Sequence, residues 1–407
     1  MATIGLFIGI SVMLIGVRKK VPIGLSALAA GLLVALLSGQ TLQVLGRSLT
    51  DLVVGNGILL LSIALITVLG KVMQTSKAME RLASSTIRLF RKPQITVILL
   101  PTFAGFLSVP GASIFSAPMV DTTGAKLGMS QEQKAVANVY FRHLWYFFYP
   151  LYPPFLFLQQ MTDIPYSAIL IPGLIGAAII FAITYWVSFR QTESVIDGQA
   201  QEGTQGAAST LLWSIFPLFL VLGLAIGFDV PFPWAVVCGI VAALLAVPGE
   251  ALTGNVLLRR FQEGVLRGVD WGIVTAVAGI VFFSRTVVNS QAVAVLASSL
   301  SSGAGSIIFV SLVVPFLIGV ITGNHQASIG ITMPIILTVL AHLPNAYTFI
   351  ALAYFASLIG YLISPAHVCL VGTTQYMGSD LQKTWQLAWI PTIIMLGLGL
   401  VFAILAL

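Results

Sequence analysis

Ser108-Val-Pro-Gly-Ala-Ser113 interrupts an apolar segment that runs from residue 93 to residue 128. A second polar interruption, Thr322-Gly-Asn-His-Gln-Ala-Ser328, stands in the middle of the apolar segment 305–342. Proline and glycine disfavour a continuous helix, because proline lacks an N–H group and glycine loses more backbone freedom. We therefore expect each segment to form a hairpin of two helices, with the polar residues at its tip.

An interrupted apolar segment follows each hairpin. After the first comes 135–160, which contains the run Tyr140-Phe-Arg-His-Leu-Trp-Tyr-Phe-Phe-Tyr-Pro-Leu-Tyr-Pro-Pro154. After the second comes 346–376, which contains Ser364-Pro-Ala-His367. The prolines predict that both helices break in their middle. Non-helical backbone at membrane depth must face protein or a water-filled cavity, so we expect the tips and the breaks to meet at one site.

The composition is that of an integral membrane protein. The chain has 407 residues, of which 58% are hydrophobic and 8% charged, with a mean hydropathy of +1.01. Soluble domains carry about 25% charged residues. Apolar runs of roughly 20 residues recur along the chain and predict spanning helices, since the strands of a membrane barrel would alternate in polarity. We attribute the net charge of +6 to basic cytoplasmic loops and not to a nucleic-acid partner.

The expected fold is all-α, with about ten transmembrane helices and two re-entrant hairpins divided between two halves. The first half, 1–189, comprises scaffold spans in 1–73, a surface arm 74–92, the hairpin 93–128, the broken span 135–160 and a span 166–189. A polar linker, 190–210, follows it. The second half, 211–407, comprises scaffold spans in 211–288, an arm 289–304, the hairpin 305–342, the broken span 346–376 and a span 385–406.

The two halves share matching residues at one sequence offset. Matches at an offset of 214 positions are Pro101 with Pro315, Gly105 with Gly319, and Tyr140-Phe141 with Tyr354-Phe355. So many matches at one offset indicate an internal duplication. Each half is expected to hold five spans and one hairpin. Because five is odd, the halves must insert with opposite orientation, as an inverted repeat.

The basic residues predict the orientation of the chain in the membrane. With both termini outside, the inner face receives most of them, and only Arg47 and Arg285 fall clearly outside. This arrangement satisfies the rule that cytoplasmic loops are rich in lysine and arginine. We therefore expect a multi-pass protein of the plasma (cell inner) membrane, with both termini outside and the linker 190–210 in the cytoplasm.

The hairpin tips and helix breaks form the candidate site for a small anion and its coupling ion. A helix that begins at the site offers N–H groups to an anion, and one that ends there offers carbonyls to a cation. For any single hydroxyl, a hydrogen bond to its own helix is the alternative. The expected substrate-binding residues are Ser108, Gly111, Ser113, Arg142, Tyr146, Tyr149, Thr322, Asn324, Ser328 and Thr373. The expected coupling-ion residues are Ser113, Asn324, His325, Ser364 and His367.

Arg142 is the most informative single residue. It lies part-way along an apolar span, where a charge is costly and usually faces the protein interior. Arg142, Tyr146 and Tyr149 follow at i, i+4 and i+7, so they share one helix face. Two interpretations carry equal weight. Either Arg142 binds an anionic substrate between the tyrosines, or it snorkels to the inner surface or braces a hairpin carbonyl.

The remaining ionisable residues limit which ions and reactions the protein can handle. His325 and His367 are candidates to carry a coupling proton, with a structural hydrogen bond as the alternative. The span centres hold no carboxylates, which argues against an antiporter built on a buried acidic pair. The two cysteines, Cys238 and Cys369, lie far apart and show no metal-type Cys/His spacing, so we expect neither a disulfide nor a metal other than sodium. Nucleotide-binding and catalytic motifs are absent, so we expect neither an enzyme nor a cofactor.

In its architecture the chain resembles the ion transporter superfamily, which includes divalent anion:sodium symporters and gluconate permeases. The resemblance covers nearly the whole length and rests on inverted halves, one re-entrant hairpin per half, and an interrupted helix after each hairpin. It implies a homodimer in which fixed scaffold spans flank hairpins and broken helices that carry substrate by an elevator motion. Both tips depart from the Ser-Asn-Thr signature of the divalent anion symporters, so only a polar tip residue such as Ser113 or Asn324 is transferred.

The leading hypothesis is a secondary transporter of a small organic anion, a carboxylate, driven by sodium or protons. The alternative is a sodium/proton antiporter on the same scaffold. A channel or a structural membrane protein is the third class. The expected partners are the anionic substrate, the lipid bilayer and a second copy of the chain.

Overall fold

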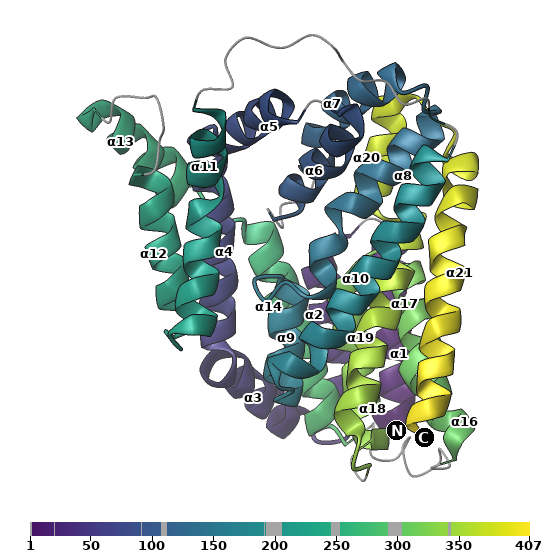
Figure 1. The fold of residues 1–407 in the computed structure, drawn as a ribbon. Helices are drawn as coiled ribbons and strands as arrows, with labels where there is room; N and C mark the ends of the chain where they lie inside the picture. Colours follow the sequence, from purple (N-terminus) through teal and green to yellow (C-terminus); the bar gives the residue numbers. More distant parts are fainter. Residues whose placement is uncertain are drawn as a thin grey trace.

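The computed structural model is a bundle of helices (Figure 1). The structure describes residues 2–19, 21–90, 92–106, 112–190, 192, 206–245, 253–291, 303–340 and 343–407. Every regular element within these ranges is a helix. Seven helices of the described residues are long and apolar enough to cross a membrane, and five shorter apolar helices accompany them. The prediction of a helical multi-pass membrane protein is therefore confirmed.

Among the described residues, seven helices reach the length of a full span, against about ten expected. Of the shorter apolar helices, Ile23–Leu37 has 15 residues. Fifteen residues of α-helix cover about 22 Å, against a hydrocarbon core of about 30 Å. This helix can cross a bilayer only if flanking turns or a locally thin membrane make up the difference.

The elements of residues 2–189 follow the predicted order. They are α1 (Ala2–Arg18), α2 (Ile23–Leu37), α3 (Thr41–Thr50), the π-helical turn η1 (Asp51–Gly55), α4 (Gly57–Thr75), α5 (Ala78–Leu89), α6 (Pro93–Phe106), α7 (Ala112–Lys126), α8 (Gln131–Arg142), the 3-10 turn η2 (Leu144–Phe147), α9 (Pro153–Thr162) and α10 (Tyr166–Phe189).

The described elements after the linker run from α11 to α21. They are α11 (Ala207–Leu222), η3 (Gly223–Gly227), α12 (Phe232–Leu245), α13 (Gly254–Arg260), η4 (Phe261–Leu266), α14 (Trp271–Asn289), α16 (Ala304–Ile308), η5 (Phe309–Val313), α17 (Val314–Thr322), α18 (His325–Leu340), α19 (Ala346–Ile363), α20 (Val368–Met377) and α21 (Leu381–Ala406). The helices around the breaks keep a constant spacing. α8 begins at Gln131 and α19 at Ala346, α9 at Pro153 and α20 at Val368, and both offsets are 215.

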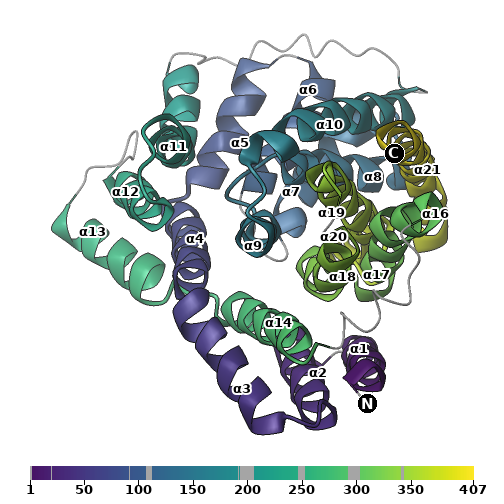
Figure 2. The ribbon, with the colours of Figure 1, turned by 90° about the horizontal axis from the view of Figure 1, so that it is seen from below.

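One group of helices consists of α1–α4 together with α11–α14, the elements predicted as scaffold spans. Within it α2 packs against α14, and α4 packs against α12, so helices of the two halves contact each other. Figure 2 shows α1, α2, α3, α4, α12, α13 and α14 along one side of the molecule. Of the predicted arms, 74–92 contains α5, whereas most of 289–304 lies outside the described residues.

The second group contains the two hairpins and the two broken helices. α6 packs against α7 in the first hairpin, and α17 against α18 in the second. The first tip falls at 107–111, outside the described residues. At the second tip Gly323 has a left-handed φ of 57°, which favours glycine. The arm that leads to this tip begins at the expected place, because α16, η5 and α17 form a continuous run of 19 residues, Ala304–Thr322.

Local sequence features explain where the broken helices start and end. Ser130 starts α8 through a capping box, in which its side chain accepts from the Gln133 backbone N–H and the Gln133 side chain accepts from the Ser130 N–H. The helix ends at Arg142, and the chain resumes as α9 with Pro153 in the first turn. The second break covers 364–367 between α19 and α20. The second break therefore lies where Pro365 predicted it. The first begins at His143, before the expected interval Tyr149–Pro154, so the prediction that Arg142, Tyr146 and Tyr149 share one helix face is wrong.

The broken helices exchange partners between the two halves. α20, from the second half, packs against α7 and α8 of the first half. α9, from the first half, packs against α18 of the second hairpin. This exchange brings both breaks and the second tip into one region of the molecule.

Candidate functional site

A cavity of about 180 Å³ lies where the two breaks meet the second hairpin tip. One lining residue, Ile273, comes from α14 of the scaffold group, and the others come from the breaks and the tip. The cavity therefore lies between the two groups of helices. Its lining consists of Arg142, Tyr146, Tyr152, Pro153, Pro154, Ile273, Gly323, Asn324, His325, Gln326, Tyr361, His367, Val368 and Cys369.

Three helices begin at the wall of this cavity. α9 starts at Pro153, α18 at His325 and α20 at Val368, and all three residues line it. The N-terminus of a helix carries a partial positive charge and, where it is not proline, N–H groups without helical partners. The first two residues of α9, Pro153 and Pro154, have no N–H, so α9 contributes only the partial charge. The N-cap residue of α20, His367, makes no side-chain capping hydrogen bond, so no cap side chain covers that end of the helix. The three helix ends favour negative charge in the cavity.

Arg142 is the cationic side chain in the cavity wall. Arg142 is 1% exposed, and its Nη1 donates to the Ala104 carbonyl oxygen of α6 at 2.9 Å. Tyr146 lines the same cavity. Among the described residues that line the cavity, none carries a carboxylate. Arg142 thus braces a hairpin carbonyl, as one interpretation predicted, and does not snorkel to the surface. It also lines the cavity, where anion binding stays a prediction.

His325 has both ring nitrogens engaged. Nδ1 lies 3.2 Å from the Tyr152 hydroxyl, and Nε2 lies 3.1 Å from the Tyr354 carbonyl oxygen. A carbonyl only accepts, so Nε2 carries the proton and the Tyr152 hydroxyl donates to Nδ1. His325 is therefore a structural link between the second tip, the first break and α19.

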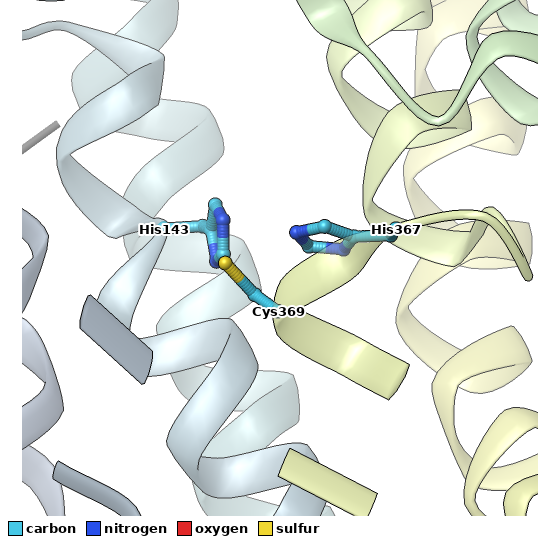
Figure 3. Close-up of side chains that lie close together, drawn as sticks. All are labelled: His143, His367 and Cys369. Carbon is cyan, nitrogen blue, oxygen red and sulfur yellow. The ribbon is translucent and has the colours of Figure 1, made fainter. Parts of the chain in front are cut away.

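His143, His367 and Cys369 form a second cluster beside the cavity (Figure 3). One ligand-type atom from each lies within 4.8 Å of the others, and all three residues are buried. Figure 3 shows the His367 ring directed at the other two side chains. His143 comes from the end of α8, and His367 and Cys369 come from the start of α20. The pairing of α8 with α20 across the two halves assembles this cluster.

The predicted polar residues divide into two sets. Asn324 lines the cavity and caps α18, since its Oδ1 accepts from the Ala327 N–H at 2.9 Å. Three hydroxyls instead donate to backbone carbonyls, which is the structural alternative weighed for lone hydroxyls. The donors and acceptors are Thr322 to Ile318 at 2.7 Å, Ser328 to Pro315 at 3.0 Å and Ser364 to Val320 at 2.6 Å.

The other predicted residues lie away from the cavity lining or outside the described part. Thr373 accepts from Asn138 Nδ2 at 3.0 Å, and Tyr149 is buried without lining the cavity. Ser108 and Gly111 lie outside the described residues, and so does the side chain of Ser113. Of the predicted set, the structure brings together five at the cavity: Arg142, Tyr146, Asn324, His325 and His367.

Several lining residues were not among the sequence candidates: Tyr152, Gln326, Tyr361 and Cys369. For two of them, the sequence position could have indicated a place at the site. Gln326 lies within the polar tip motif, and Tyr361 precedes Ser364 by three residues and so shares its helix face. Cys369 follows His367 by two residues, but the third member of its cluster, His143, comes from the other half of the chain, so no signal in the sequence indicated the cluster as a whole.

Comparison with known protein families identifies the family to which the chain belongs. It belongs to the family described as Protein of unknown function (DUF401), which matches residues 2–406. A search of the curated proteins found no match. The family membership therefore covers nearly the whole chain.

Proposed function

We propose that this DUF401 protein is an ion-coupled secondary transporter of a small organic anion, a carboxylate. The observation that carries the proposal is the cavity in which three helices begin around the buried Arg142. Helix N-termini and an arginine fork are the groups that bind a carboxylate, through N–H donors and bidentate hydrogen bonds. No lining residue among those described contributes a carboxylate.

A second feature of the cavity supports an acceptor-rich ligand. Gln326 is 8% exposed and lines the cavity, and within the described residues its Nε2 has no hydrogen-bond partner. An unsatisfied buried donor costs about 1–3 kcal/mol. A carboxylate oxygen in the cavity would accept from it. The tyrosine hydroxyls of Tyr146, Tyr152 and Tyr361 provide further polar contacts in the wall.

The arrangement of the two groups of helices supports alternating access. The cavity lies between the scaffold group, through Ile273, and the hairpins with the broken helices. Discontinuous helices around a central site are typical of carriers built from inverted repeats. In an elevator motion, the hairpins and broken helices would move with the bound anion against α1–α4 and α11–α14. The resemblance to the ion transporter superfamily adds a homodimer to this proposal.

The proposed orientation follows from where the basic helices lie. Figure 1 places α5 and α13 at the end of the molecule opposite to both termini. α5 carries Arg81 and Arg88, and α13 carries Arg259 and Arg260. By the positive-inside rule that end faces the cytoplasm, so the termini lie outside a plasma membrane. Sodium and protons are both retained as candidate coupling ions, with Asn324 beside the cavity as one oxygen donor.

The proposal is tested by uptake into proteoliposomes that contain the purified chain. We expect a labelled mono- or dicarboxylate to accumulate when an inward sodium gradient or pH gradient is applied, and to equilibrate without a gradient. Empty liposomes give the background. Failure of every carboxylate in the panel to accumulate under either gradient would contradict the proposal. Exchange of sodium for protons without carboxylate uptake would instead establish the antiporter.

Arg142→Gln tests the anion contact within this assay. We expect at least a tenfold loss of uptake, because a hydrogen bond to a charged group contributes about 1.5–3 kcal/mol. Arg260→Gln is the matched control, since Arg260 is also buried and donates to a backbone carbonyl, that of Leu244, but lies outside the cavity lining. Uptake that survives in Arg142→Gln would remove Arg142 from the substrate site.

A further inference from the structure

We propose that His143, His367 and Cys369 form a binding site for a transition-metal ion of the Zn²⁺ class at the wall of the cavity. Imidazole nitrogen and thiolate sulfur are the donors that zinc prefers. The site goes beyond the proposed transport function, because metal binding by these side chains requires neither a carboxylate substrate nor movement of the hairpins.

The distances suit a metal site after a small closure. The three ligand atoms lie within 4.8 Å of one another. Bonds of about 2.0–2.1 Å to nitrogen and 2.3 Å to sulfur, at tetrahedral angles, would place the same atoms roughly 3.3–3.6 Å apart. Rotations about side-chain bonds supply a closure of this size. Burial removes competing water, since His143, His367 and Cys369 are 0%, 1% and 6% exposed.

Backbone contacts orient both imidazoles for ligation through Nε2. Nδ1 of His143 lies 2.6 Å from the Val139 carbonyl oxygen, and Nδ1 of His367 lies 3.3 Å from the Leu362 carbonyl oxygen. A carbonyl accepts only, so we assign the ring proton to Nδ1 in both residues and the lone pair to Nε2. Metal-bound histidines usually donate their second ring N–H to such a carbonyl.

Nε2 of His367 is the clearest sign of a missing ligand. It is buried, and no described residue forms a hydrogen bond with it. A buried acceptor without a partner is unfavourable, so an ion at this position would satisfy it. Nε2 of His143 lies 3.3 Å from the Tyr361 hydroxyl, a long contact that a metal bond would replace.

The position of Cys369 favours a thiolate ligand. It lies in the first turn of α20, whose positive end stabilises negative charge on sulfur. His367 and Cys369 also line the cavity together with Arg142. Three protein donors leave one position of a tetrahedral ion open, and here that position faces the cavity.

Cobalt titration of the tag-free, detergent-purified full chain tests the site. Co²⁺ replaces Zn²⁺ in tetrahedral sites and reports a sulfur ligand by a thiolate-to-cobalt charge-transfer band. We expect one Co²⁺ per chain, the charge-transfer band, and displacement of both by Zn²⁺. Absence of saturable binding, or binding without the charge-transfer band, in the wild-type chain overturns the proposal whatever the variants do.

Two variants and one control identify the ligands. Cys369→Ser should abolish the charge-transfer band, and His367→Gln should weaken Co²⁺ binding at least tenfold. Cys238→Ser removes the other cysteine, which is exposed, and should leave the titration unchanged. A band that persists in Cys369→Ser, or disappears in Cys238→Ser, overturns the assignment. Because the titration involves no substrate and no transport, its failure is separate from failure of the uptake assay.

Discussion

Thr373 illustrates how one hydroxyl can hold two halves of a molecule together. Its Oγ1 accepts from Asn138 Nδ2 at 3.0 Å, and the Asn138 Oδ1 accepts from Ser116 Oγ at 2.6 Å. Thr373 belongs to α20, Asn138 to α8 and Ser116 to α7. This chain of hydrogen bonds therefore fastens the second broken helix to the first hairpin. The sequence placed Thr373 in the substrate site, whereas the structure gives it a partner in another helix.

Thr373→Val tests this structural role. We expect the free energy of unfolding to fall by about 0.5–1.5 kcal/mol, because a buried hydrogen bond between two helices is lost. The KM for carboxylate uptake should not change, since Thr373 does not line the cavity. Thermal unfolding in detergent and uptake in proteoliposomes give the two readouts.

Thr374→Val is the matched control for this substitution. The Thr374 hydroxyl donates only within its own helix, to the Val371 carbonyl oxygen at 2.8 Å. Its removal should affect stability less than the loss of Thr373. A raised KM with unchanged stability in Thr373→Val would return Thr373 to the substrate site.

At the scale of helices, two glycines set how closely the hairpins approach the broken helices. A Cβ at Gly105 in α6 would overlap the Arg142 carbonyl oxygen of α8. A Cβ at Gly319 in α17 would lie 2.5 Å from the Ser357 carbonyl oxygen of α19. Gly105 and Gly319 are 214 positions apart, and the residues that they face, Arg142 and Ser357, are 215 positions apart. The two contacts therefore lie at equivalent positions in the two halves of the sequence. The close approach at Gly105 also brings Ala104 within reach of the Arg142 guanidinium.

Gly105→Ala should therefore separate α6 from α8. We expect a loss of stability of about 1–3 kcal/mol, because the added methyl meets rigid backbone and not a side chain that can move. Carboxylate uptake should fall as well, since Arg142 shifts with the carbonyl. Gly46→Ala in α3 is the control, because nothing lies within 4 Å of its Cβ position. The control should be neutral or slightly stabilising, by up to about 1 kcal/mol. Equal thermal midpoints for the two variants would contradict the close-packing argument.

Helices and their breaks were largely predictable, and side-chain partners were not. Pro365 and Pro153 favour a break, because proline lacks an N–H group. Prolines locate the breaks only in part, since within the described helices six prolines lie inside a helix: Pro101, Pro118, Pro172, Pro217, Pro334 and Pro391. The hydroxyls of Ser328 and Ser364 could face either the cavity or a carbonyl. Which one they meet depends on a neighbouring helix that places Pro315 or Val320 beside them. Such a choice is set by packing between elements and leaves no local pattern in the sequence.

At the scale of the whole molecule, α9 and α20 each pack against the hairpin of the other half, and this packing determines which residues meet at the site. The offset between the halves relates α9 to α20 but does not say which hairpin each one contacts. Because α20 packs against α8, His367 and Cys369 meet His143, a residue more than 200 positions away in the chain. Because α9 packs against α18, Tyr152 meets His325. Sequence spacing rules detect metal ligands within one segment, so this cluster could not be found by them.

The orientation of the whole molecule in the membrane gives the last prediction. Figure 1 places α3 and α5 at opposite ends of the molecule, and both carry exposed positions, Thr50 in α3 and Ser84 in α5. In a Cys238→Ser background, we expect a membrane-impermeant thiol reagent to label Thr50→Cys in intact cells and Ser84→Cys only in inside-out vesicles. The physical reason is the cost of moving the basic helix α5 across the bilayer. The background chain retains the buried Cys369 and serves as the control for labelling at that site. Labelling of Ser84→Cys from outside would reverse the proposed orientation, and with it the side from which each hairpin is reached.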